Sequence, residues 1–180
     1  MNRGRGDGMA ACRSVVRGRR RAAGEGGQAL IEFAFVAPII LVFLLGLVDF
    51  GIALDRRVVL DHAVREGARF ASVGGQALTT GVAATVEEVK AYTSAQSQGI
   101  ADAGGAPGSD NYVDVCYEDA NANGVVGDVG DGVRVSIHYR HDFVTGFTSM
   151  LYASPGSIDM VASGSARVEY RAQGTPASCV

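Results

Sequence analysis

Three groups of residues in this 180-residue chain have types and spacings that could do chemistry. The first is Glu32, the one charged side chain in an apolar run that extends from Ala29 to Val48. A carboxylate at the centre of a lipid bilayer costs up to about 3 kcal/mol, and such a group usually faces a partner. We therefore interpret Glu32 as a functional residue that faces a partner.

The second group is a series of Asp and Asn residues. Asp119, Asn121 and Asn123, followed by Gly124, begin the D-x-N-x-N-G pattern of a calcium-binding EF-hand loop. The twelfth position of that pattern is Gly130, where an EF-hand loop has glutamate. A hairpin loop built from Asn and Gly explains the same residues. We expect no metal and no cofactor, with calcium as the alternative for this loop.

The third group is the cysteines. Cys116 and Cys179 follow the apolar run, whereas Cys12 precedes it. Disulfides persist outside the cytoplasm, so we expect Cys116 and Cys179 to pair if this region lies outside; two buried or free thiols are the alternative. The sequence shows no P-loop, no G-x-S-x-G and no pairing of a cysteine with a histidine. We therefore expect that this protein is not an enzyme.

The apolar run around Glu32 determines the predicted architecture. Its twenty residues span about 30 Å as a helix, which is the thickness of the hydrocarbon core of a bilayer. We predict a basic cytoplasmic leader over residues 1–27 and a transmembrane helix over residues 28–48, with a kink at Pro38. Seven arginines in the leader place the N-terminus in the cytoplasm and the C-terminal region outside. The membrane explains this basic leader better than nucleic acid, which we exclude as a partner.

Beyond the membrane the hydrophobic pattern first remains helical. Residues 49–98 are predicted as a helical stem, in which a first helix ends at Gly74–Gly75 and a second runs from about Thr80 to Ser97. The first helix has apolar or small residues that approximate one face: Phe50, Ala53, Leu54, Leu60, Ala63, Val64, Ala68 and Ala71. A stem of this kind can pack on a sheet.

The pattern then becomes one of alternating strands. Residues 99–180 are predicted as an extracytoplasmic β-rich region, with strands at 112–117, 133–140 and 158–170, the last interrupted or bulged at Gly164. Between the second and third strands, Phe143–Tyr152 is predicted to be a short helix or packed loop. The predicted fold class is α+β, with a long N-terminal transmembrane helix that continues into an amphipathic stem and a small antiparallel sheet.

The residues before the apolar run contain a short motif. Gly27 is followed by four residues, then by Glu32 and Phe33. This spacing resembles the type III signal of the type IV pilin superfamily. The resemblance implies that a prepilin peptidase cuts between Gly27 and Gln28, so that Glu32 becomes the fifth residue of the mature chain. It also implies that Glu32 sets subunit register by pairing with the terminal amine of a neighbouring subunit.

Longer stretches extend the resemblance. ALIEFAFVAPIILVFLLGLVDFG, AVREGARFAS and the closing SGSARVEY are similar to the TadE-like family, pilin-related proteins of tight-adherence (Flp) pilus systems. The resemblance implies a non-enzymatic minor pilin or pseudopilin that assembles or anchors a pilus used in adhesion or secretion. Its partners would be other pilins and pseudopilins, assembly platform proteins, and the prepilin peptidase if the leader is processed. The alternative is a single-pass, envelope-tethered binding domain, with or without calcium, that has no pilus role.

Overall fold

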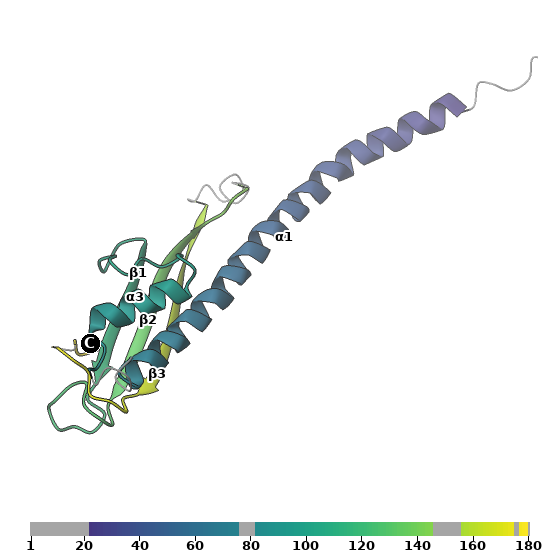
Figure 1. Ribbon diagram of the computed structural model, residues 1–180. Helices are drawn as coiled ribbons and strands as arrows, with labels where there is room; N and C mark the ends of the chain where they lie inside the picture. The colour runs from purple at the N-terminus through teal and green to yellow at the C-terminus, as the bar shows by residue number, and fades with distance from the viewer. Residues whose placement is uncertain (1–21, 76–81, 146–155, 175–176, 180) are drawn as a thin grey trace, which may run out of the picture. The chain divides into compact units, whose positions relative to one another are not determined.

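The computed structural model describes residues 22–75, 82–145, 156–174 and 177–179, and the backbone alone of residues 22–26. The chain divides into two compact units, Met1–Leu41 and Val42–Val180. The element order is helix α1, helix α3 and strands β1, β2 and β3 (Figure 1). The fold is α+β, as the sequence predicts: a long apolar helix precedes a small antiparallel sheet.

Helix α1 extends over Ala22–Ser72 and contains Pro38. It ends where the sequence predicts, because Gly74 and Gly75 adopt positive φ angles of 69° and 65°, which glycine adopts without steric cost. The Gly75 N–H donates to the carbonyl oxygen of Phe70 at 2.7 Å, which satisfies a carbonyl in the last turn.

The half of α1 in the second unit buries one side. That side consists of small or branched residues, namely Ala53, Leu60, Ala63, Val64, Ala68 and Ala71. Phe50 and Leu54, which the sequence places on the same face, are exposed instead. The buried side of the helix contains Ala53 and Leu60, whereas the larger side chains of Phe50 and Leu54 lie outside it.

Helix α3 covers Val86–Gln96, so the predicted start near Thr80 is too early over the residues described. Residues 82–85 lie outside any helix or strand, and the Ala84 N–H donates to the Gly74 carbonyl oxygen at 2.9 Å. Thr85 then caps the helix: its hydroxyl accepts from the Glu88 N–H, and the Glu88 carboxylate accepts from the Thr85 N–H. This reciprocal pair is a capping box, which fixes the helix start at Val86.

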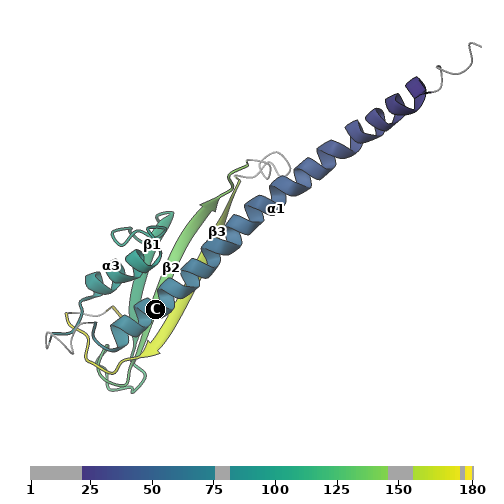
Figure 2. The ribbon, with the colours of Figure 1, turned by 45° about the vertical axis from the view of Figure 1, so that its right-hand side comes forward.

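The sheet has three antiparallel strands in the order β1 (Asn111–Glu118), β2 (Gly132–Asp142) and β3 (Ser157–Arg167) (Figure 2). In the register Val115 pairs with Val135, and Val135 with Gly164. Alternation predicts the buried faces of β1 and β2 correctly. The inward residues are Val113, Val115 and Tyr117 on β1, and Val133, Val135 and Ile137 on β2.

Strand β3 is continuous through Gly164, so the predicted interruption is wrong. The reason for glycine there is packing against α1. A Cβ atom on Gly164 would lie 2.6 Å from the carbonyl oxygen of Val64. Further along the same strand, Arg57 of α1 donates to the Val161 carbonyl oxygen at 2.6 Å. The helix backbone therefore lies directly on β3.

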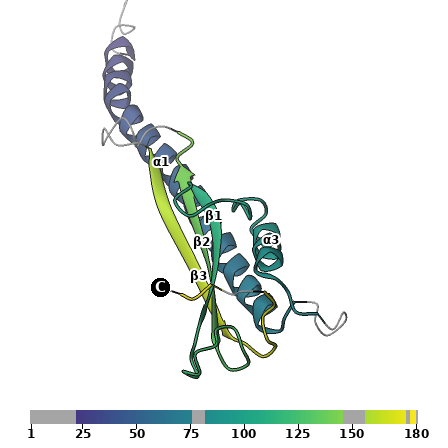
Figure 3. The same ribbon diagram turned by 90° about the vertical axis from the view of Figure 1, so that its left-hand side faces the viewer.

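Helices α1 and α3 and the inner face of the sheet share one hydrophobic core. Leu60 and Val64 from α1, Val89 from α3, and Tyr117 and Ile137 from the sheet are its large, fully buried members. Figure 3 shows α3 and the part of α1 that belongs to the second unit on one side of the three strands. The segment predicted as a short helix or packed loop, Phe143–Tyr152, lies outside the described residues from 146 onward.

Candidate functional site

Glu32 lies on α1, in the first unit, with its side chain exposed. Its Oε1 accepts a hydrogen bond from Nε2 of Gln28, one helical turn earlier, at 3.2 Å. The large neighbours Leu30, Ile31, Phe33 and Phe35 are also exposed. The carboxylate therefore projects from an exposed apolar part of the helix, and within the described part of the chain its hydrogen-bond partner is a neutral side chain of its own helix.

By its length and composition, the apolar run is a candidate membrane span. Among the described residues one helix is long and apolar enough to cross a membrane; its most apolar window has a mean hydropathy of 2.7 and no buried residue. A core helix of a soluble domain would bury such a window. Pro38 lies inside this run, and the predicted cleavage bond between Gly27 and Gln28 is helical.

The first charge after the run is Asp49, which is only 2% exposed. Its Oδ1 accepts from the backbone N–H groups of Val144 and Thr145 at 3.1 and 3.2 Å, and its Oδ2 accepts from the Thr145 hydroxyl. We call these three residues the Asp49 clasp. It joins α1 to the connection that leaves β2, and these hydrogen bonds compensate the loss of water around the carboxylate.

At the other end of the sheet, Cys116 of β1 and Cys179 form a disulfide with a Cα–Cα distance of 4.9 Å. The Tyr117 N–H donates to Ala177 O, and the Cys179 N–H donates to Tyr117 O. The C-terminal segment is thus held along the free edge of β1 by backbone and covalent bonds. Such a cover protects a sheet edge from pairing with another chain.

The Asp/Asn loop between β1 and β2 satisfies its own carboxylates. Asp119 accepts from the N–H groups of Asn123 and Gly124 at 3.2 and 2.8 Å. Asp128 accepts from the side-chain amides of Asn121 and Asn123, and these bonds hold its pKa below the ordinary value.

The buried Asp131 closes the same loop. Its two oxygens accept from the N–H groups of Ala120, Gly127 and Asp128. All six oxygens of these three carboxylates accept hydrogen bonds. Among the described residues no group of three or more His, Cys, Asp or Glu is arranged to hold a metal ion. Here Asp119, Asn121 and Asn123 form a loop stabilised by side-chain hydrogen bonds.

The two histidines of β2 lie on opposite faces of the sheet. His138 stacks on Tyr112 of β1 on the outer face, with ring centroids 4.4 Å apart. His141 is buried on the inner face beside Phe143, with its Nε2 atom unpaired. A spacing of three along a strand separates the imidazoles, so they cannot share a ligand.

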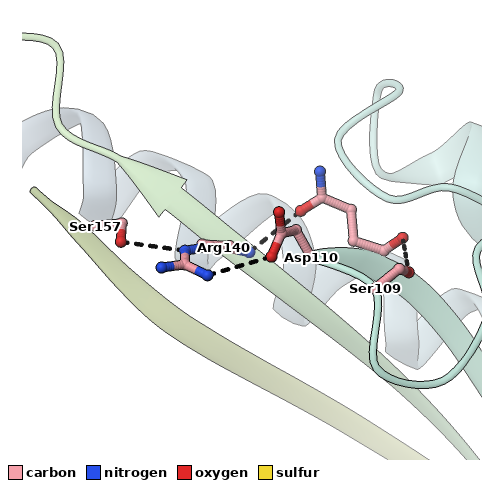
Figure 4. A network of polar contacts seen from close by, with 5 residues as sticks. Ser109, Asp110, Arg140 and Ser157 are labelled. Atoms are coloured by element: carbon pink, nitrogen blue, oxygen red, sulfur yellow. Dashed lines mark hydrogen bonds and ion pairs between the residues drawn. The ribbon is translucent and has the colours of Figure 1, made fainter. Parts of the chain in front are cut away.

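A polar network joins the three strands near this stack (Figure 4). Arg140 donates from Nη1 to Asp110 at 3.3 Å and from Nε to the Ser157 hydroxyl at 3.2 Å. Its backbone N–H donates to Oδ1 of Asn111 at 3.2 Å, and the Ser109 hydroxyl donates to the Asn111 carbonyl oxygen at the same distance. The network ties the start of β1 and the start of β3 to the end of β2, which is a structural role.

Comparison with known proteins bears on the helix. Residues 27–69 match the family model described as TadE-like protein. The resemblance seen in the sequence is therefore confirmed over these residues, which include Gly27, Glu32, Pro38 and Asp49. No curated protein and no solved structure matches the chain.

Within the TadE-like segment, sequence reasoning identified Glu32 but gave no role to Asp49. In the sequence, Asp49 looks like an ordinary polar residue after an apolar run. Its partners Val144 and Thr145 lie 95 and 96 residues later. The available signal was the continuation of apolar residues beyond it, at Phe50, Ile52 and Leu54. A single acid inside a longer apolar stretch indicates a compensated charge.

Proposed function

We propose that this protein is a membrane-anchored, TadE-like minor pilin or pseudopilin that acts, without enzymatic activity, in the assembly or anchoring of a tight-adherence pilus for adhesion or secretion. The observation that carries the proposal is the position of Glu32. It is an exposed carboxylate near the start of an exposed apolar helix, within the segment that matches the family model.

The mechanism we propose is lateral docking of helices inside the membrane. A carboxylate in a medium of low dielectric constant is stabilised when a positive group approaches it, and the positive group gains equally. If the leader is removed after Gly27, the new terminal amine of Gln28 in a neighbouring subunit supplies that charge. Glu32 would then set the axial register between this subunit and the pilins or assembly platform proteins around it.

Two features support placement of the leader in the cytoplasm and the folded unit outside. The leader contains seven arginines, and positively charged segments beside a span stay on the cytoplasmic side. The Cys116–Cys179 disulfide suits an oxidising compartment. Both point to a single-pass protein of a bacterial cell membrane.

Glu32→Ala tests the docking role. We expect the variant to insert in the membrane at the normal level and to lose piliation, because the apolar helix remains and the paired charge does not. Leu41→Ala is the matched control, since it shortens another exposed side chain of the same apolar run and leaves the carboxylate in place. Normal piliation in Glu32→Ala cells would refute the proposal.

Processing by a prepilin peptidase is tested separately. We expect intact-protein mass spectrometry to show a mature chain that begins at Gln28, and Gly27→Val to block that cut. A Cβ at Gly27 meets no atom within 4 Å, so this substitution leaves the fold intact. Gly51→Val is the control, because Gly51 is equally open and lies far from the cleavage bond. A full-length leader in piliated cells would show that processing is not required.

A further inference from the structure

The end of the apolar run of α1, which belongs to the second unit, has exposed apolar side chains around a buried charge. Leu47, Val48 and Phe50 are exposed, whereas Asp49 between them is buried and accepts three hydrogen bonds. In a soluble domain the arrangement would be the reverse, with the charge in water and the large apolar side chains packed. The Asp49 clasp hides the one charge of this stretch and leaves the apolar side chains outside.

The residues that complete the clasp continue this apolar surface. Val144 is 74% exposed although its N–H is held by Asp49. The Phe143 N–H donates to Gly156 O at 2.7 Å, so a backbone hydrogen bond joins the two ends of the β2–β3 connection. No charged side chain occurs in the sequence between Asp142 and Asp159.

We propose that the Asp49 clasp presents Val144 and the adjoining turn of α1 to the lipid surface of the membrane that α1 enters. The inference rests on α1 being a membrane span, as in the proposed function. Continuity selects lipid as the partner, since the exposed Leu47 and Val48 are the last residues of the apolar run and the exposed Phe50 follows directly after Asp49. The clasp supplies the hydrogen bonds that Asp49 loses with its water, so the turn enters the interface without an unpaired charge.

The contact has a defined consequence for the folded unit. Apolar side chains that enter the boundary between headgroups and acyl chains hold a protein surface against the membrane. The β2–β3 end of the sheet therefore faces the lipid. The β1–β2 loop, at the opposite end of the eleven-residue strand β2, stands roughly 35 Å away.

The test uses the full chain with Cys12→Ser, so that a newly introduced cysteine is the only free thiol. Val144→Cys carries an environment-sensitive fluorophore, and the protein is reconstituted in phosphatidylcholine/phosphatidylglycerol vesicles with or without doxyl-labelled lipid. Val129→Cys is the matched control, because Val129 is also an exposed valine (63%) but precedes β2. Ile40→Cys, inside the apolar run, reports insertion of the span.

We expect doxyl lipid to quench the label at 40 and at 144, but not at 129. Quenching at 40 alone would overturn the inference and leave the span intact. Absence of quenching at position 40 would overturn both the membrane span of the proposed function and this inference. A label at 144 that is shifted to the blue but not quenched would indicate a protein partner or a second copy, and would also refute lipid contact.

Asp49→Ala, combined with Val144→Cys, tests the clasp itself. We expect quenching at 144 to fall towards the value at 129 while quenching at 40 is unchanged. Unchanged quenching at 144 would show that the clasp does not position this surface. Formation of the Cys116–Cys179 disulfide, measured by mass, verifies that the variant folds.

Discussion

Gly164 of β3 lies directly beneath the backbone of Val64 in α1. A Cβ atom at position 164 would approach the Val64 carbonyl oxygen to 2.6 Å and its carbonyl carbon to 2.8 Å. Real Cβ atoms essentially never come that close to backbone atoms. The absence of a side chain at one strand position thus sets the distance between the long helix and the sheet.

Gly164→Ala should destabilise the folded unit by about 1–3 kcal/mol, because the helix must move away from the strand to admit a methyl group. The measurement is the free energy of unfolding of the full chain in detergent, from denaturant titration. Gly132→Ala is the control, since its Cβ would make ordinary contacts at 3.6 Å with Glu118. Equal stability of the two variants would contradict the packing described.

Gly67→Ala tests the contact between α1 and α3. A Cβ there would lie 2.1 Å from the Thr93 hydroxyl oxygen, which donates to Val89 O at 2.7 Å. Alanine at an open helix position would stabilise by about 1 kcal/mol, so a loss of stability identifies the clash. The double variant Gly67→Ala/Thr93→Ala should recover part of that loss, as measured by a double-mutant cycle. Strictly additive effects would argue against direct contact.

These two glycines show where sequence reasoning ends. Alternation predicts the strands, and the apolar run predicts the long apolar helix, because both patterns are local in the sequence. In the sequence, a glycine inside a helix, such as Gly67, is expected only to weaken that helix, and Gly164 is predicted to interrupt a strand. The reason for each glycine lies on another element of the fold. Only the assembled structure shows which backbone or side chain occupies the space.

The start of α3, in contrast to the packing of these two glycines, follows from local sequence signals. Thr85 and Glu88 form a capping box whose T-x-x-E spacing is visible in the sequence, so the helix start at Val86 was predictable from local signals. The Asp49 clasp was not predictable, because its donors come from Val144 and Thr145 on a distant connection. Local chemistry sets helix ends, whereas tertiary packing decides which charges are buried.

Removal of the Cys116–Cys179 disulfide should lower stability by about 4 kcal/mol in the limit where the bond acts only on the unfolded chain. The large value follows from the separation of 63 residues that the bond closes. The measurement compares the unfolding of the Cys116→Ala/Cys179→Ala variant with that of the oxidised protein. The Cys12→Ala variant is the control and should be unchanged. A loss well below 1 kcal/mol would mean that the C-terminal segment contributes little to the fold.

Tyr117 should make the folded unit sensitive to alkali. Its side chain is buried on the inner face of β1, and this desolvation raises the pKa of the phenol above 10.0. A group whose pKa is raised on folding stabilises the protein below its unfolded pKa, and this contribution is lost as the pH rises through the folded value. The free energy of unfolding should therefore decrease above about pH 10. In Tyr117→Phe the decrease should be smaller. Identical alkaline profiles for the two proteins would show that ionisation of Tyr117 is not coupled to folding.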